Sequence, residues 1–131
     1  MARRMVSANR PWEKSMGYAR AVRVGNMIEV SGTAPADPEG NILFPGDVYG
    51  QTKQALETIG AALEELGASF DDVVRTRVLL KDVATWKDAG RAHGEVFSEI
   101  RPANTTMQAG PFIDPEILVE IEVTAIAGPE G

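Results

Sequence analysis

Only two segments of this 131-residue chain have the periodicity of an amphipathic helix, and strand-like runs lie before, between and after them. Two helices can cover one face of a sheet of four or five strands. The order of the segments is ββαβαββ. The sequence therefore predicts an α+β fold in which one mixed sheet carries two helices on one face.

The strand-like runs are bounded by residues that favour turns. Two of them form a predicted hairpin over residues 20–30, because Gly25-Asn26 separates them and glycine accepts the positive φ of a tight turn. The other strands, rich in β-branched residues, are predicted over residues 73–80, 105–108 and 117–126.

Each helix is delimited by residues that favour helix ends. Asp47 is placed to cap a helix over about 48–66, and Gly67 follows where a left-handed helix stop belongs. The second helix is predicted to begin after Thr85 and to end before Pro102.

The charge of the chain is unevenly distributed. The net charge is −6. From the length, we expect a single domain over residues 1–131. Residues 1–25 carry six basic side chains and one acid, so this part is +5 and the rest is −11. An acidic body repels phosphate backbones, so nucleic acid is not expected to be a general partner. Residues 1–16 are predicted to be an extended segment, either a solvated end or a basic arm for RNA.

The chain has no cysteine and one histidine, His93. Disulfides, a thiolate nucleophile and the Cys or His pairs of a zinc site are therefore excluded, and no metal is expected. No apolar run approaches the roughly 18 residues of a membrane span. No apolar stretch follows the first basic residues, as it would in a secretory signal. We therefore expect a cytoplasmic protein with no membrane partner.

Charged and apolar side chains are mixed on one predicted face of the sheet. Alternation in the strand 73–80 places Arg75 and Arg77 on one side, and alternation in the strand 117–126 groups Glu120 with Glu122. Such a face is a poor solvent surface and a good subunit interface, so we expect an oligomer. The side opposite the two arginines is predicted to hold Val74, Thr76, Val78 and Leu80.

Motifs for nucleotide binding, for a serine nucleophile and for metals are missing, which leaves carboxylates, arginines, hydroxyls and backbone amides for any chemistry. Glu120 and Glu122 are candidate acid/base groups, or alternatively a charge ladder paired with the arginines. Ser31-Gly32 ends a strand, where glycine either brings backbone N–H groups to a ligand or simply bends the chain. On its helix, His93 lies among apolar residues, where packing is favoured over catalysis.

The ordered segments resemble the Rid/YjgF reactive-intermediate deaminase family, also called the endoribonuclease L-PSP family. The resemblance runs from about Tyr18 to Gly128. Its markers are Gly17-Tyr18, Ala21 to Asn26, Val30-Ser31-Gly32-Thr33-Ala34-Pro35, Gln51 to Leu56, Pro102-Ala103-Asn104-Thr105-Thr106 and Leu118 to Glu122.

The resemblance implies a chorismate-mutase-like fold and a homotrimer, with the sheets around a central barrel and three clefts between subunits. Family members hydrolyse enamines or imines, such as 2-aminoacrylate, to a 2-keto acid and ammonia without a cofactor. We therefore expect a small-molecule metabolite at the intersubunit clefts.

The family's site residues carry over in part. Tyr18, Ser31 and Gly32 match substrate-binding positions, and Glu120 matches the glutamate that helps to position the attacking water. The family arginine that clamps the substrate carboxylate is replaced by Asn104. Losing such a charge-assisted contact costs about 1.5–3 kcal/mol of binding.

Two further positions depart from the deaminase pattern. Thr106 stands where a cysteine is frequent, and Arg77 stands where a small hydroxyl residue is usual. We hypothesise that Arg77, with backbone amides near Gly32, takes over anion binding. The alternative is that Arg77 is held in an intersubunit ion pair.

The resemblance thus predicts a cofactor-free hydrolase or deaminase of small imines or enamines, with a substrate that is not the standard one. Two alternatives stay open. The first is a trimeric metabolite-binding protein with little or no catalysis. The second is the endoribonuclease or translation inhibitor of the family's older names, against which the acidic body counts.

Overall fold

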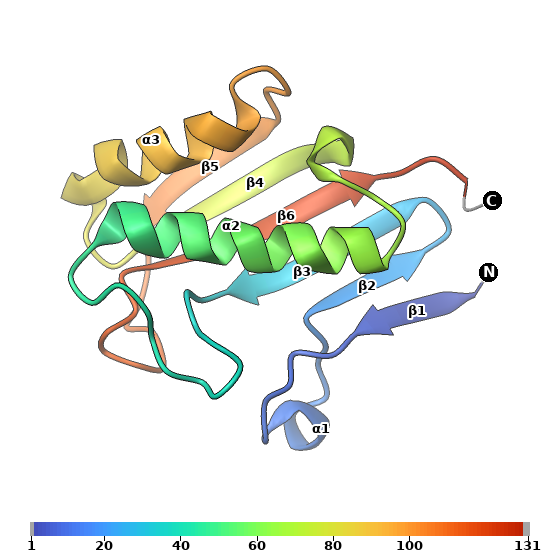
Figure 1. The fold of residues 1–131 in the computed structure, drawn as a ribbon, viewed down its shortest axis with the longest axis horizontal. Coiled ribbons are helices and arrows are strands. Elements are labelled where there is room, and N and C mark those ends of the chain that lie inside the picture. Colours follow the sequence, from blue (N-terminus) through green and yellow to red (C-terminus); the bar gives the residue numbers. More distant parts are fainter. Residues whose placement is uncertain (1, 130–131) are drawn as a thin grey trace.

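Six strands form one sheet in the order β1-β2-β3-β6-β4-β5 in a computed structural model that describes residues 2–129 (Figure 1). β4 and β5 pair in parallel and the other neighbours are antiparallel, so the sheet is mixed, as predicted. The strands are β1 (Arg3–Val6), β2 (Ala21–Val24), β3 (Met27–Thr33), β4 (Val73–Leu80), β5 (Ala103–Gln108) and β6 (Val119–Ile126).

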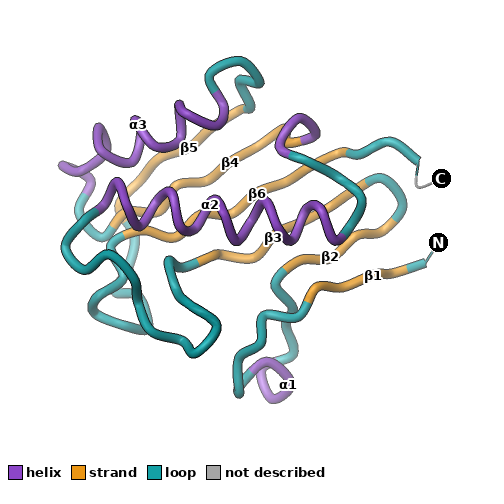
Figure 2. The backbone as a smooth tube through the Cα atoms, viewed as in Figure 1, coloured by secondary structure: helices purple, strands orange, loops and turns teal. Residues whose placement is uncertain are grey.

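Both long helices lie on the same face of this sheet (Figures 1 and 2). α2 (Val48–Glu65) connects β3 to β4, and α3 (Trp86–Phe97) connects the parallel strands β4 and β5. The predicted α+β fold with two helices on one face is confirmed. The remaining helical elements are short: α1 (Glu13–Met16) and two 3₁₀ turns, Phe70–Asp72 and Val83–Thr85. None of the described helices is both long and apolar enough to cross a bilayer.

The helix α2 follows the pattern predicted for it. The Asp47 side chain accepts a hydrogen bond from the Gly50 N–H, and Gly67 adopts a left-handed φ of 77° just beyond the helix. Its apolar stripe packs on the buried row of β6, and every member of both rows is at most 1% exposed. Full burial of one such side chain contributes about 1.5–3 kcal/mol. The two rows are Leu56, Ile59, Leu63 and Leu66 on the helix and Val119, Ile121 and Val123 on the strand.

The N-terminal segment contains a strand that we did not predict. β1 pairs antiparallel with β2, with Arg4 opposite Arg23, and so gives the sheet a sixth strand. Its four residues are mostly exposed and show no alternation of buried side chains. Backbone pairing with the edge of β2 places it there, together with Val6, which packs against the core, and Arg4, whose side chain donates to the Glu65 carbonyl oxygen at 2.8 Å.

One predicted side-chain orientation in β4 is wrong. Val74 was expected beside Thr76, but Val73 is 3% exposed and Val74 is 46% exposed. The register against β6 shifts between Val73 and Arg75, so Val74 is the extra residue of a bulge. Because of the bulge, the residues before it face the opposite side of the sheet from the one predicted, whereas the residues after it face the predicted side.

Candidate active site

A cavity of about 590 Å³ brings together most of the predicted site residues. We call it the Glu120 cleft and define it by five of its lining residues, Tyr18, Arg20, Gly32, Thr33 and Glu120. The end of β3 lies beside the beginning of β6 because the two strands are antiparallel. The segment that leads into β2 completes the wall, since the backbone N–H of Ser31 donates to the Arg20 carbonyl oxygen.

A bulge in β3 shapes the wall of the Glu120 cleft at Ser31 and Gly32. Val30 pairs with Val123 and Thr33 with Ile121, so β3 has one extra residue over this stretch. The Ser31 hydroxyl donates to the Ala19 carbonyl oxygen at 2.7 Å. The Thr33 hydroxyl donates back to the Ser31 carbonyl oxygen at 2.7 Å. Bulges redirect the chain in this way next to functional sites.

The start of β6 is fixed by a buried side chain of α2. Gln51 is fully buried, and its amide nitrogen donates to the Glu116 carbonyl oxygen at 3.0 Å. Its amide oxygen accepts the Leu118 N–H at 2.8 Å. These bonds satisfy a buried polar group and hold the strand two residues before Glu120.

Glu120 is a half-buried carboxyl in the wall of the Glu120 cleft. Burial raises its pKa above the ordinary glutamate value, the positive charge of Arg20 partly opposes this, and the negative charge of Glu122 adds to it. A carboxyl that keeps its proton to higher pH can donate that proton to a reacting nitrogen, and its ionised form can accept one from water. The arrangement therefore suits general acid/base chemistry.

The site leaves no room for a side chain at position 32, which is a glycine. A Cβ added to it would lie 2.9 Å from Glu120 Oε1, closer than real Cβ contacts come. Its backbone φ is not in the left-handed region, so conformational freedom is not the reason for glycine here.

Replacing Gly32 with alanine is therefore expected to displace the Glu120 carboxyl and to preserve the fold. The clashing atom is the tip of a flexible side chain, so the free energy of unfolding should change by less than about 1 kcal/mol. A displacement of about 1 Å at a reacting group can lower turnover about 100-fold. The matched control is Gly90→Ala on α3, where the added Cβ meets nothing within 4 Å. Equal activity of the two variants would contradict this role for Gly32.

Two predicted site residues lie elsewhere in the same chain. Asn104 and Thr106 are on β5, the strand at the opposite edge of the sheet from β1. The Asn104 amide donates to the Thr76 hydroxyl at 2.9 Å, and the Thr106 hydroxyl donates to Asn104 Oδ1 at 2.9 Å. The Thr76 hydroxyl is also 2.9 Å from His93 Nε2. Asn104 is thus tied into a hydrogen-bonded network beneath α3, apart from the Glu120 cleft.

The histidine in this network is partly buried. Burial lowers the pKa of His93, so the neutral imidazole is favoured. Its ring packs on Phe97 with the centroids 4.7 Å apart. This environment fits the packed histidine that the sequence pattern favoured.

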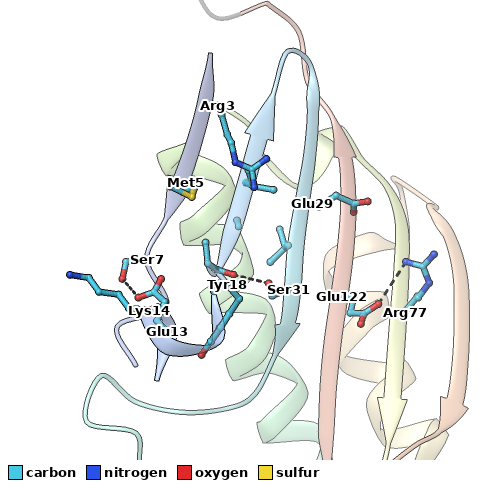
Figure 3. A pocket seen from close by; sticks show the side chains of 15 residues that line it. Arg3, Met5, Ser7, Glu13, Lys14, Tyr18, Glu29, Ser31, Arg77 and Glu122 are labelled. Carbon is cyan, nitrogen blue, oxygen red and sulfur yellow. Dashed lines mark hydrogen bonds and ion pairs between the residues drawn. The ribbon is translucent and has the colours of Figure 1, made fainter. Parts of the chain in front are cut away.

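Arg77 lies on the open face of the sheet, where it pairs with Glu122 (Figure 3). Arg77 Nη1 is 3.8 Å from Glu122 Oε1, and the two side chains are 43% and 40% exposed. Both line a second cavity of about 810 Å³, which also includes Tyr18 and Ser31 but neither Gly32 nor Glu120. The predicted arginine–glutamate pairing thus occurs within one chain.

Arg20 is a cleft residue that we did not predict, although it is the basic side chain closest in sequence to Tyr18. The sequence did contain a signal for it: Tyr18 and Arg20 are two residues apart just before a strand, and residues at this spacing lie on the same side of an extended chain.

Among the described residues, His, Asp and Glu side chains form no group of three that can hold a metal ion.

Comparison with known proteins identifies the family of this chain. The sequence model of the endoribonuclease L-PSP family matches residues 8–127. This chain belongs to that family. An uncharacterised protein of Streptomyces coelicolor is 41% identical over 126 residues, which are 95% of this chain and 92% of that protein. The 3-aminoacrylate deaminase RutC of Acinetobacter baylyi is 34% identical over 108 residues, 82% of this chain and 85% of that protein.

Solved structures of relatives have the same fold. A Mycobacterium tuberculosis member of the YjgF/YER057c/UK114 family superposes with a TM-score of 0.85 at 38% identity, covering 96% of this chain and all of that one. The Escherichia coli YjgF gene product superposes with a TM-score of 0.79 at 27% identity, covering 94% and 98%. The predicted membership of the Rid/YjgF family and its fold are confirmed.

Proposed function

We propose that this protein is a cofactor-free hydrolase that releases ammonia from small enamine or imine metabolites at the Glu120 cleft. The observation that carries the proposal is Glu120, a half-buried carboxyl with a raised pKa in a cavity of about 590 Å³. A relative at 34% identity that is named a 3-aminoacrylate deaminase supports the reaction class. The lack of cysteine fits the cytoplasm as the proposed compartment.

The proposed reaction needs only acid/base groups and water. The enamine takes a proton on carbon and becomes an imine, and water then adds to the imine carbon. The C–N bond of the resulting carbinolamine breaks, and the products are a carbonyl compound and ammonia. Protonated Glu120 supplies the proton to the enamine carbon, and the ionised carboxylate then accepts a proton from the attacking water. The re-formed acid protonates the leaving nitrogen and recovers a proton from the carbinolamine hydroxyl as the carbonyl forms, so its protonation state is restored after each turnover.

The test is a panel of enamines generated in place from stable precursors by a second enzyme. Carbonyl and ammonia release are followed with and without the protein, because these compounds also hydrolyse spontaneously. Acceleration of at least one substrate supports the proposal. Binding of a panel member without acceleration would instead favour the metabolite-binding alternative, and cleavage of RNA alone would favour the endoribonuclease.

We expect 2-aminoacrylate to be a poor substrate within that panel. Asn104 is uncharged and hydrogen bonded to Thr76, so it offers the substrate carboxylate no positive charge. The missing contact predicts turnover about 10- to 150-fold slower than that of an arginine-bearing relative under the same conditions. Equal rates would show that the arginine at this position matters less than we assume.

We also propose that the protein is a homotrimer assembled through the open face of its sheet. Next to its charged residues, this face carries an exposed apolar row across three paired strands. Burying such a row against a neighbour is favourable because apolar surface leaves water. The row consists of Val24, Met27 and Ile126, which are 38%, 52% and 47% exposed.

Light scattering is expected to give three times the 14.1 kDa chain mass. The trimer would also allow the exposed β5 edge, with Asn104 and Thr106, to approach the Glu120 cleft of a neighbouring subunit. A monomer at micromolar concentration would contradict both statements.

A further inference from the structure

We propose that Arg20 is the anion-binding residue of the Glu120 cleft, and that the ligand is a small carboxylate anchored by its guanidinium. This inference rests on the proposed function, because it names the substrate class of the same cleft. It assigns to Arg20 the charge that Asn104 does not supply.

The first support is the geometry of the guanidinium. Arg20 Nη1 donates to the Gly32 carbonyl oxygen at 2.9 Å and to the Thr33 hydroxyl at 3.0 Å. Within residues 2–129 these are the hydrogen bonds of the side chain, which leaves Nε and Nη2 free of protein acceptors. These two atoms lie on one edge of the planar group and fit the two oxygens of a carboxylate. The two hydrogen bonds of Nη1 hold the half-buried guanidinium in place, so this donor edge is oriented before a ligand arrives.

The second support is the distribution of charge in the cleft. Arg10 and Arg20 both line it, and their mutual repulsion lowers the pKa of Arg20 beyond the larger effect of burial. Arginine nevertheless keeps its proton at neutral pH. Glu120 attracts Arg20 but forms no ion pair with it in the described structure. The cleft thus holds two arginines together with an acid/base carboxyl, although Asp114 and Glu122 also line it.

This arrangement predicts how a substrate is oriented. A carboxylate held at Nε and Nη2 of Arg20 leaves the nitrogen-bearing carbon to face Glu120. The anchor comes from the segment before β2 and not from Asn104 on β5, so the distance between carboxylate and reacting carbon differs from that in an arginine-bearing relative. A substrate other than 2-aminoacrylate follows from the new anchor point.

The test compares a carboxylate with its neutral amide. The probes are crotonate, in which a methyl group replaces the amine of 3-aminoacrylate, and crotonamide. NMR titration measures both dissociation constants for the wild-type protein, Arg20→Met, Arg20→Lys and Arg77→Met. We expect Arg20→Met to weaken crotonate binding about 10- to 100-fold, which corresponds to about 1.4–2.8 kcal/mol. Crotonamide binding should change less than about twofold, and Arg20→Lys should retain part of the crotonate affinity.

The outcomes separate this inference from the proposed function. If Arg20 had only a structural role, Arg20→Met would weaken the binding of crotonate and crotonamide equally, and that result would overturn the inference. A selective loss with Arg77→Met, or wild-type protein that binds neither probe, would also overturn it. Binding needs no turnover, so an enamine panel without acceleration would defeat the proposed function and leave the Arg20 result interpretable. Arg20→Lys keeps the test valid if Arg20→Met does not fold.

Discussion

Replacing Glu120 with glutamine is expected to lower enamine hydrolysis about 10²- to 10⁴-fold, the usual contribution of a general acid/base group. Glutamine is nearly isosteric with glutamate and retains hydrogen bonding, but it neither donates a proton to the leaving nitrogen nor accepts one from water. Steady-state ammonia release on the best panel substrate measures the effect. The matched control is Glu29→Gln on β3, a carboxylate that lies outside the Glu120 cleft.

The same variant should be more stable than the wild type at neutral pH. Because burial raises the pKa of Glu120, the folded protein holds this proton more tightly than the unfolded chain does. The resulting stabilisation is complete below the ordinary glutamate pKa of about 4.3 and is lost as pH rises through the higher folded-state pKa. The melting temperature of Glu120→Gln minus that of the wild type should therefore increase from about pH 4 to pH 7. A difference that falls with pH, or unchanged activity, would contradict the role we assign to Glu120.

Replacing Arg23 with methionine is expected to be strongly destabilising. Arg23 is 2% exposed and lies on the helix-covered side of β2. Its Nε donates to the Gly25 carbonyl oxygen at 2.9 Å, Nη1 to that of Leu66 at 2.8 Å and Nη2 to that of Gly128 at 2.6 Å. One side chain thus joins the β2–β3 turn, the end of α2 and the segment after β6.

Methionine fills a similar volume but leaves these carbonyl oxygens without their donor. Hydrogen bonds to a charged group contribute about 1.5–3 kcal/mol each and are not additive, so we expect a total loss of about 3–5 kcal/mol. For a chain of this size that corresponds to a melting temperature lower by roughly 10–15 °C. Urea unfolding measures the loss. Arg23→Lys keeps the positive charge but not the several N–H donors of the guanidinium, so its free energy of unfolding should be intermediate. A methionine variant as stable as the wild type would contradict this account.

Arg23 also illustrates what sequence patterns miss. The run Ala21-Val22-Arg23-Val24 alternates so that its valines suggest the buried face, yet Ala21 and Arg23 are buried and Val24 is 38% exposed. A period of two defines two faces but does not determine which of them meets the core. Here the carbonyl oxygens of three distant segments make burial of the arginine favourable, and no local pattern encodes them.

Where burial on one face dominates, the patterns were sufficient. The stripe of α2 and the alternation of β6 are both observed as predicted, because each element has one strongly apolar face. The bulge at Val74 and the pairing of β1 were missed, because a backbone irregularity and a strand held mainly by backbone pairing leave little trace in side-chain hydrophobicity.

The candidate site shows the same division. Tyr18, Ser31, Gly32 and Glu120 were identified from the resemblance, and all four line one cleft. Arg20 was missed because its contacts are made with the irregular stretch of β3, where its guanidinium donates to the Gly32 carbonyl oxygen, and no local pattern encodes that bulge. Asn104 and Thr106 do not line that cleft within one chain, so a place for them in the site requires the trimer that we propose.

The claim that the Glu120 cleft is the ligand site is tested most directly by a crystal structure of the protein with crotonate bound. The account predicts the carboxylate at Nε and Nη2 of Arg20 and the far end of the ligand against the Glu120 carboxyl. Crotonate bound beside Arg77 and Glu122 instead, with the Glu120 cleft empty, would contradict it.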